Sequence, residues 1–253
     1  MTARLLALDT ATEWLAAGLR TPHGRWLRHE SGGAQASARL VPVLQQLLQQ
    51  GGESLGALDA IAFGVGPGAF TGLRTACAVA QGLGFGAGLP LLPIDSLLLV
   101  AEAARATQAD GGAGAWWVAV DARMDEVYAA EYRHDAGTGW HTVTPPALYT
   151  LAALAARWEA AAPVRVAGNA PRVFGARLPL QGVRCIEPVE APGEMAETCE
   201  GGRAAALLTL AEAAWARGDA IAADQALPLY LRDKVALTTE ERLRQRAAAE
   251  PRG

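Results

Sequence analysis

Residues 59–86 have the sequence DAIAFGVGPGAFTGLRTACAVAQGLGFG and join a strand to a helix through a glycine-rich loop. The first seven residues are apolar and partly branched, which predicts a buried strand that ends at Gly66 and Gly68. Thr71 is the expected N-cap of a helix over residues 72–84, which carries little charge. Because a surface helix normally keeps a polar face for water, this helix is expected to be covered on two sides, by its own sheet and by a partner protein.

Length, composition and charge limit the classes of protein to which the chain can belong. The chain has 253 residues, is 51% hydrophobic and has a net charge of -4. It can therefore bury a large core in one domain or in two lobes, and it has no overall positive field to bind nucleic acid. Its three cysteines are far apart and indicate neither a disulfide framework nor a zinc site. The N-terminus does not resemble a signal peptide and no apolar run is long enough to cross a bilayer, so a reduced, soluble, cytoplasmic protein is expected.

The lysine content excludes one large group of enzymes. Lys234 is the only lysine in the sequence, and it follows Asp233 rather than a glycine. A Walker A loop needs the Gly-Lys pair to hold nucleotide phosphates, so a P-loop ATPase or GTPase is excluded.

The remaining pattern predicts two consecutive α/β units. The first unit is expected to contain strands at 5–9, 14–19, 25–30, 59–65 and 91–94 and helices at 37–50, 72–84 and 97–105. A glycine-rich break at 107–115 separates it from a second unit, with strands at 116–120, 126–132, 141–143, 164–167 and 186–188 and helices at 151–158 and 204–217. Tight turns between the opening strands predict an antiparallel meander. The expected fold is a duplicated α/β lobe with a reduced second copy: lobes at 1–107 and 108–202, then a segment at 203–253 that returns toward the first lobe and ends in a tail expected to fray.

Two turns of the first unit carry candidate phosphate ligands. An acid and hydroxyl groups in a turn between strands can bind a phosphate or its magnesium ion, and glycines let a backbone approach phosphate closely. The candidates are Asp9, Thr10, Thr12, Gly66 and Gly68. The alternative is a turn stabilised by hydrogen bonds from side chains to its own backbone. A dinucleotide loop is disfavoured because the glycines do not follow the GxGxxG spacing and three strands precede them.

Four motifs together resemble one known family. They are Asp9-Thr10 between two strands, GPGAFTGLR at 66–74, Asp121-Ala122-Arg123 with Glu126-Val127-Tyr128, and PLYLR at 228–232. In this order and over nearly the whole chain they resemble the TsaB family, also called YeaZ. The resemblance implies lobes of the actin, hexokinase and Hsp70-like (ASKHA) superfamily.

The resemblance also implies a function and a set of partners. It implies a non-catalytic, dimerising scaffold subunit of the machinery that transfers a threonylcarbamoyl group to the adenosine next to the anticodon, in tRNAs that read codons beginning with A. The implied partners are the catalytic subunit TsaD as a heterodimer, the ATPase TsaE and a second copy of this chain, with tRNA contacted through the complex and no membrane. No cofactor of its own is implied, although ATP or ADP with Mg is expected as an option at the partner interface.

One departure and one rival function sharpen this expectation. Where relatives often carry a histidine-containing run, this chain has Gln35-Ala36-Ser37-Ala38-Arg39, which excludes a TsaD-type metal site at that position. The rival is a self-sufficient enzyme of the same fold, either a nucleotide-using enzyme or a glycoprotease. Such an enzyme needs phosphate loops in both lobes or metal ligands, and the second lobe offers only Gly168-Asn169 as a remnant.

The two long helices of the first unit are the expected partner interface. Small residues on one helix permit close approach of another helix, and branched residues on the other supply larger knobs. The predicted interface residues are Arg39, Leu40, Val43, Leu44, Leu47, Arg74, Ala78 and Gln81. The alternative is that the apolar members of this set are internal core.

Overall fold

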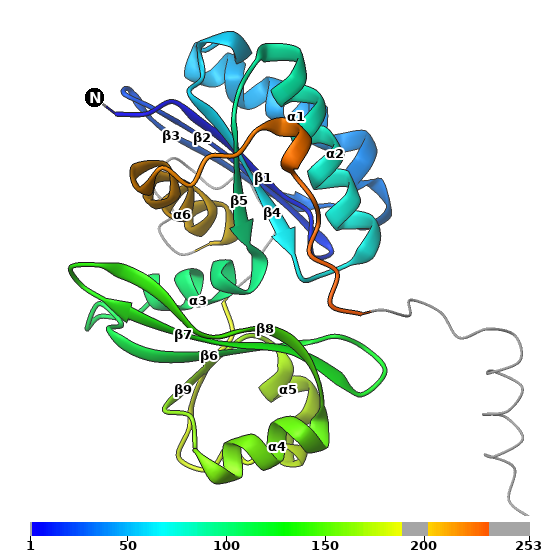
Figure 1. Ribbon diagram of the computed structural model, residues 1–253, viewed down its shortest axis with the longest axis vertical. Helices are drawn as coiled ribbons and strands as arrows, with labels where there is room; N and C mark the ends of the chain where they lie inside the picture. Colours follow the sequence, from blue (N-terminus) through cyan, green and yellow to red (C-terminus); the bar gives the residue numbers. More distant parts are fainter. Residues whose placement is uncertain (1, 189–201, 233–253) are drawn as a thin grey trace, which may run out of the picture.

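The first lobe is built on a five-stranded sheet in the strand order β3-β2-β1-β4-β5 (Figure 1). The computed structural model describes residues 2–188 and 202–232. The elements of this lobe are β1 (Leu5–Asp9), β2 (Trp14–Thr21), β3 (Gly24–Ser31), α1 (Ala36–Gly51), β4 (Ala60–Gly66), α2 (Phe70–Ala87), β5 (Leu91–Asp95) and α3 (Ser96–Ala106). The first three strands pair antiparallel, whereas β4 and β5 run parallel to β1.

The second lobe repeats this architecture in a shortened form. Its elements are β6 (Gly114–Asp121), β7 (Glu126–Asp135), β8 (Gly139–Thr150), α4 (Leu151–Ala160), β9 (Arg165–Ala167), α5 (Ala170–Phe174) and β10 (Arg184–Ile186). The sheet order β8-β7-β6-β9-β10 matches that of the first lobe position by position. The last two strands have only three residues each, so the expected duplicated α/β fold with a reduced second copy is confirmed.

Most predicted elements are present, and three details differ from the sequence analysis. The helix of the glycine-rich stretch begins at Phe70 with Ala69 as its N-cap, so the prediction that Thr71 caps it is wrong. β8 has twelve residues, whereas a strand of three was predicted. The strand continues through its two prolines because it lies at the edge of the sheet, where proline is tolerated. α5 was not predicted, since its five residues are too few for a periodic pattern. The residues at 189–201 and the expected tail after residue 232 lie outside the described residues.

The first sheet buries both of its faces, and β1 shows how the sequence achieves this. Leu6 and Leu8 point toward α1 and α2, whereas Leu5 and Ala7 point toward α6 (Arg203–Arg217) on the opposite face. All four side chains are fully buried. A strand buried on both faces has a continuous apolar run, which is the pattern from which β1 was predicted.

Helix α3 lies between the two sheets and contributes to both cores. Leu99 and Ala103 pack in the first-lobe core with α6, and Leu97 and Ala101 pack in a cluster with the second sheet. Figure 1 shows α3 between α6 above and strands β6 and β7 below. The helix therefore joins the lobes through an apolar layer rather than through a linker alone.

Polar contacts support this interlobe layer. The hydroxyl of Tyr132 donates a 2.5 Å hydrogen bond to Asp95, the N-cap residue of α3. Further along the helix, Trp140 donates to the buried carboxylate of Glu102, which also pairs with Arg105. Burial raises the pKa of Asp95, and its hydrogen bond from Tyr132 lowers that pKa in part. Within 2–188 and 202–232, no helix is long and apolar enough to cross a membrane.

Candidate functional site

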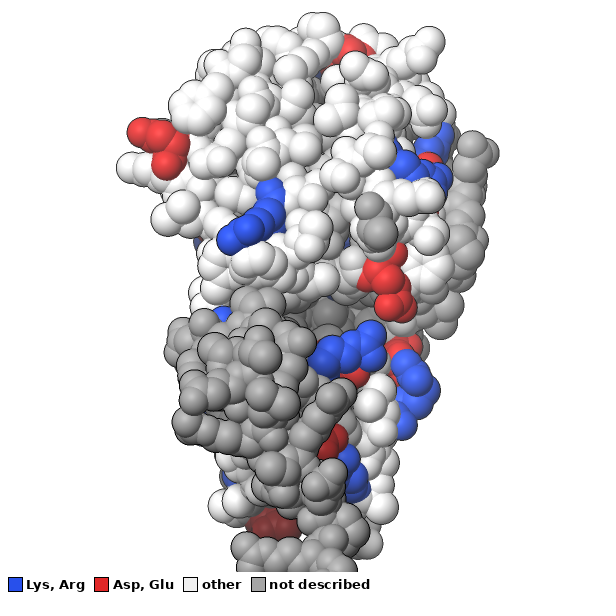
Figure 2. Space-filling model, turned by 90° about the vertical axis from the view of Figure 1, so that its right-hand side faces the viewer, with Lys and Arg blue, Asp and Glu red and all other residues white. Residues whose placement is uncertain are grey.

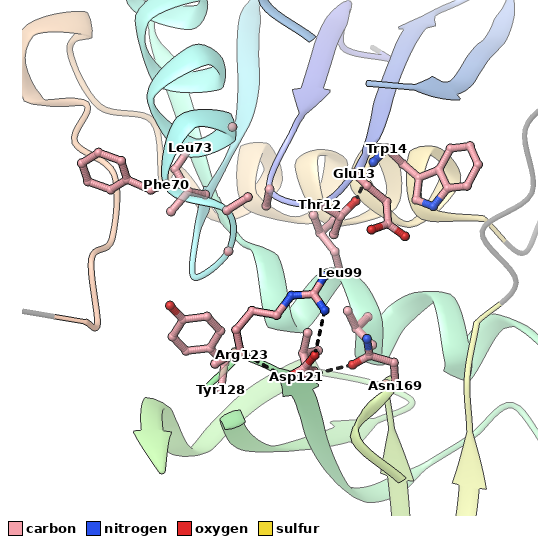
Figure 3. Close-up of a pocket in the computed structure, with 18 of the residues that line it drawn as sticks. Thr12, Glu13, Trp14, Phe70, Leu73, Leu99, Asp121, Arg123, Tyr128 and Asn169 are labelled. Atoms are coloured by element: carbon pink, nitrogen blue, oxygen red, sulfur yellow. Dashed lines mark hydrogen bonds and ion pairs between the residues drawn. The ribbon is translucent and has the colours of Figure 1, made fainter. Parts of the chain in front are cut away.

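A cleft of about 1270 Å³ separates the two lobes (Figure 3). The parallel strands β1, β4 and β6 end at it, so loops from both sheets line its walls. In open α/β sheets, ligands bind at the carboxyl ends of parallel strands. The predicted phosphate ligands would therefore have to line this cleft.

Asp9 does not reach the cleft, because its carboxylate is completely buried and internally paired. Arg203 of α6 donates from Nε to Oδ1 of Asp9 at 2.9 Å. The hydroxyl of Ser96 donates to Oδ2 at 3.1 Å, and the backbone N–H of Ala11 donates to Oδ1 at 3.1 Å. A carboxylate with three internal donors and no exposed surface is not available to a magnesium ion or phosphate. The prediction of Asp9 as a ligand is therefore wrong for this conformation, and its role is structural.

The other predicted phosphate ligands also serve the packing of the loops. Thr10 donates from its hydroxyl to the carbonyl of Gly72, and Thr12 accepts from the backbone N–H of Trp14. A Cβ at Gly68 would lie 2.4 Å from the carbonyl oxygen of Ala11, so glycine is needed there for close approach of two loops. The contact of Thr12 matches the alternative interpretation, a turn stabilised by its own hydrogen bonds, whereas Thr10 and Gly68 join this turn to the glycine-rich loop and α2.

Gly66 is confined in the same way. Its N–H donates to the hydroxyl of Ser96 at 3.0 Å, and its φ of +112° lies in a region that favours glycine. A Cβ there would approach the carbonyl oxygen of Leu229 to 2.9 Å. Gly66 thus lets the C-terminal segment pass directly over the end of β4.

The second-lobe side of the cleft is polar and internally paired. Asp121 accepts from the backbone N–H of Arg123 at 2.8 Å, and Asn169 accepts from the backbone N–H of Asp121 at 2.8 Å. Figure 3 shows Arg123 extending into the cleft above Asp121. Nearby, Arg172 makes a forked pair with Glu187, which raises the pKa of the arginine. The charges that line this wall are therefore largely balanced within the lobe.

Four of the predicted interface residues lie in the core of the monomer. Leu40, Val43, Leu44 and Leu47 have relative exposures of 0 to 4% and pack with the first sheet. The periodicity of α1 correctly identified an apolar face, but that face is turned inward. The assignment of these four side chains to a partner contact is wrong, and the core alternative holds.

The other four predicted interface residues lie nearer the surface. Ala78 is exposed on the outer side of α2, and Arg39 is exposed and paired with Glu30 of β3. Arg74 is also exposed, with its guanidinium 3.9 Å from the ring centroid of Phe70. Gln81 is half-buried and turned toward the C-terminal segment. The structure thus leaves Arg39, Arg74 and Ala78 available to a partner.

Two important contacts were missed from the sequence. Arg203 lies 194 residues from Asp9, and no local pattern connects them, although a basic residue at the start of an apolar helix is a weak signal because it opposes the helix dipole. The C-terminal segment covers part of α2, since Gln81 donates to the carbonyl of Ala226 and Cys77 donates to the same oxygen. Part of the surface of α2 that was expected to meet a partner protein is therefore covered by the C-terminal segment of this chain. Within the described ranges, no group of three or more His, Cys, Asp or Glu residues could hold a metal ion.

Comparisons with known proteins identify the family. A family model described as TsaD, tRNA N6-adenosine threonylcarbamoyltransferase, matches residues 31–172. The solved structure of YeaZ from Pseudomonas aeruginosa superposes with a TM-score of 0.76 at 37% identity, over 90% of this chain and 100% of that one. The chain belongs to the TsaB (YeaZ) family. The similarity proposed from the four sequence motifs is thus confirmed.

Curated relatives of this TsaB-family chain carry a functional name. The tRNA threonylcarbamoyladenosine biosynthesis protein TsaB of Escherichia coli is 39% identical over 138 residues, which is 54% of this chain and 58% of that protein. The protein of the same name from Haemophilus influenzae is 41% identical over 128 residues, 50% of this chain and 52% of that protein. The chain spans about half the length of the curated relatives it matches.

Proposed function

We propose that this TsaB-family protein is a non-catalytic, partner-binding subunit in the biosynthesis of threonylcarbamoyladenosine in tRNA. The observation that carries the proposal is the outer stripe of α2. Its exposed members are Thr71, Arg74, Ala78, Gly82, Phe85 and Gly86. Among the described residues of α2, Arg74 alone carries a charge, and Phe85 is 65% exposed.

An exposed stripe of this composition is typical of a protein contact. Small residues let a partner helix approach closely, and an exposed aromatic side chain supplies an anchor that water solvates poorly. Figure 2 shows this side of the molecule, on which the first-lobe half carries few charged side chains.

The buried pair of Asp9 and Arg203 supports a non-catalytic role. The first-lobe loop, where an enzyme of this fold would hold magnesium and phosphate, has its carboxylate paired with an arginine. The partner is expected to supply the chemistry. We infer that it is a TsaD-type transferase and that a second copy of this chain competes for the same stripe. Contact with TsaE and tRNA then occurs through the assembly in the cytoplasm, and any ATP or ADP with Mg belongs to the interface between subunits.

A charge placed on the stripe tests the proposal. Ala78→Glu should weaken association with a second copy and with TsaD, because it buries a carboxylate without a partner. Ala152→Glu, on the exposed side of α4 in the other lobe, is the matched control and should leave association unchanged. Analytical ultracentrifugation measures both associations, and circular dichroism melting shows whether each variant is folded. Full association of a folded Ala78→Glu variant would refute the assignment of this stripe.

The polar cleft favours one rival function, a self-sufficient nucleotide-using enzyme. Its test is the purified protein alone with Mg·ATP and with peptide substrates. Clear turnover that disappears in Asp121→Asn would support the rival, since Asp121 lines the cleft. If the purified protein turns over neither ATP nor peptide, the result counts against the rival enzyme.

A further inference from the structure

Residues 226–232 run from the outer side of the first lobe to the second lobe, past the cleft. Figure 1 shows this segment descending beside α2 toward the second lobe. Leu229, Tyr230 and Arg232 of the segment also line the cleft. The segment thus contacts both lobes.

Hydrogen bonds and a ring contact fix the first-lobe end of the segment. The carbonyl of Ala226 accepts from Gln81 at 3.0 Å, and the N–H of Leu229 donates to the carbonyl of Val65 in β4 at 2.7 Å. The ring of Tyr230 packs on that of Phe70 in a tilted arrangement, with ring centroids 5.1 Å apart and an interplanar angle of 37°. Its hydroxyl also accepts from Nε of Arg74 at 3.0 Å.

The second-lobe end is fixed by a single side chain, Arg232. Its Nη2 donates to the carbonyl of Ala122 at 2.8 Å and lies 2.7 Å from the carboxylate of Glu126. The same nitrogen also approaches the carbonyl of Arg123 at 3.3 Å. Ionic and backbone contacts from one guanidinium form a charge-assisted cluster, and the arginine side chain is only 16% exposed.

The turn that Arg232 contacts has an unusual backbone. Arg123, Met124 and Asp125 have φ values of +66°, +57° and +58°, and all three lie in the left-handed region. Such conformations are unfavourable for side chains other than glycine and persist only where surrounding contacts hold them. Arg232 holds this turn from outside the second lobe, whereas Arg177 holds it from inside through Asp125.

Few residues lie between the two fixed ends of the segment. Three residue steps separate Leu229 from Arg232, and fully extended they span at most about 11 Å. While both ends remain bound, the separation between the end of β4 and the β6–β7 turn is limited to this backbone span plus the length of the Arg232 side chain and the hydrogen bonds at each end. We propose that residues 226–232 form a strap that fastens the second lobe to the first and limits opening of the cleft.

The test measures the distance between the lobes in the full chain. Nitroxide labels at Gln49→Cys in α1 and Glu159→Cys in α4 report this distance by electron paramagnetic resonance, because both positions are exposed. The background replaces Cys185 and Cys199 with serine and keeps the buried Cys77. Release of the strap should broaden the distance distribution and lengthen its mean.

Two variants release the strap from opposite sides, and a third is the matched control. Arg232→Met and Glu126→Gln should both broaden the distribution, whereas Arg177→Met loosens the same turn without touching the strap and should not. Hydrogen exchange at the N–H of Leu229 should be roughly tenfold faster, or more, in Arg232→Met. The proposal is overturned if the two release variants keep the wild-type distribution, or if Arg177→Met broadens it equally.

Discussion

Replacing Arg203 with methionine should destabilise the protein strongly, because it leaves the carboxylate of Asp9 buried without its ionic partner. Asp9 has no exposed surface and the side chain of Arg203 is 3% exposed, so solvent cannot replace the lost contact. Removing one partner of such a pair typically costs about 3–5 kcal/mol. Ser96 and Ala11 still donate to the carboxylate, which places the expected loss near the lower end, about 3 kcal/mol.

The assay is urea unfolding followed by circular dichroism. For a chain of this length, a loss of about 3 kcal/mol corresponds to a melting temperature lower by roughly 6–12 °C. The slope of the free energy of unfolding against urea should not change. Combining Asp9→Asn with Arg203→Met should cost less than the sum of the single changes, because the double variant buries no unpaired charge.

Arg217→Met is the control for this experiment. Arg217 lies at the other end of α6, and its pair with Asp219 is exposed, so its replacement should change stability by less than about 0.5 kcal/mol. If Arg203→Met lies within the same range as the control, the pair does not stabilise the fold and the structural role assigned to Asp9 is wrong.

Three further changes probe other parts of the account. Tyr132→Phe should lower the free energy of unfolding by about 1–3 kcal/mol, and this loss should grow as the pH rises through the raised pKa of Asp95. Burial raises the pKa of Asp95, and the hydrogen bond from Tyr132 lowers it in part. Without that hydrogen bond the folded state holds the proton of Asp95 more tightly, so the variant loses more stability as the pH rises and the carboxyl ionises. A loss of stability that does not depend on pH would contradict this. Gly72→Ala should lower the melting temperature sharply, since its Cβ would lie 1.8 Å from the backbone oxygen of Thr10. Gly86→Ala, in an open part of the same helix, should instead stabilise the protein by about 0.5–1 kcal/mol. Melting curves of the two variants should therefore shift in opposite directions, and equal shifts would contradict the close contact at Gly72. Leu47→Ala should lower the free energy of unfolding in urea by about 2–5 kcal/mol, because the side chain is fully buried. An unfolding curve like that of the wild type would mean that Leu47 is not part of the core.

The sequence predicted the elements of the fold well because local patterns determine them. The continuous apolar run of β1 and the helical spacing in α1 each depend on a few neighbouring residues. The same patterns also indicated the duplication, which the matched strand order of the two sheets confirms. The five residues of α5 carry too short a pattern to be recognised.

The site was predicted less well, because its contacts join distant parts of the chain. The periodicity of α1 showed that one face is apolar, but not whether that face meets the sheet or a partner. Asp9 fitted the pattern of a phosphate ligand, and only the position of Arg203 in space shows that its carboxylate is occupied. The sequence predicts that the segment at 203–253 returns toward the first lobe, but the contacts of Ala226 with α2 could not be predicted, since they join residues far apart in the sequence.

The central claim is that this chain contributes to tRNA modification through the outer stripe of α2 and not through its own chemistry. The most direct measurement is the yield of threonylcarbamoyladenosine in a reconstitution with TsaD and the other components from the same cell, comparing the wild-type chain, its omission and Ala78→Glu. We predict full yield with the wild-type chain and little or none in the other two reactions, with no product from this chain alone. Equal yields in all three reactions, or product formed by this chain without TsaD, would contradict the account.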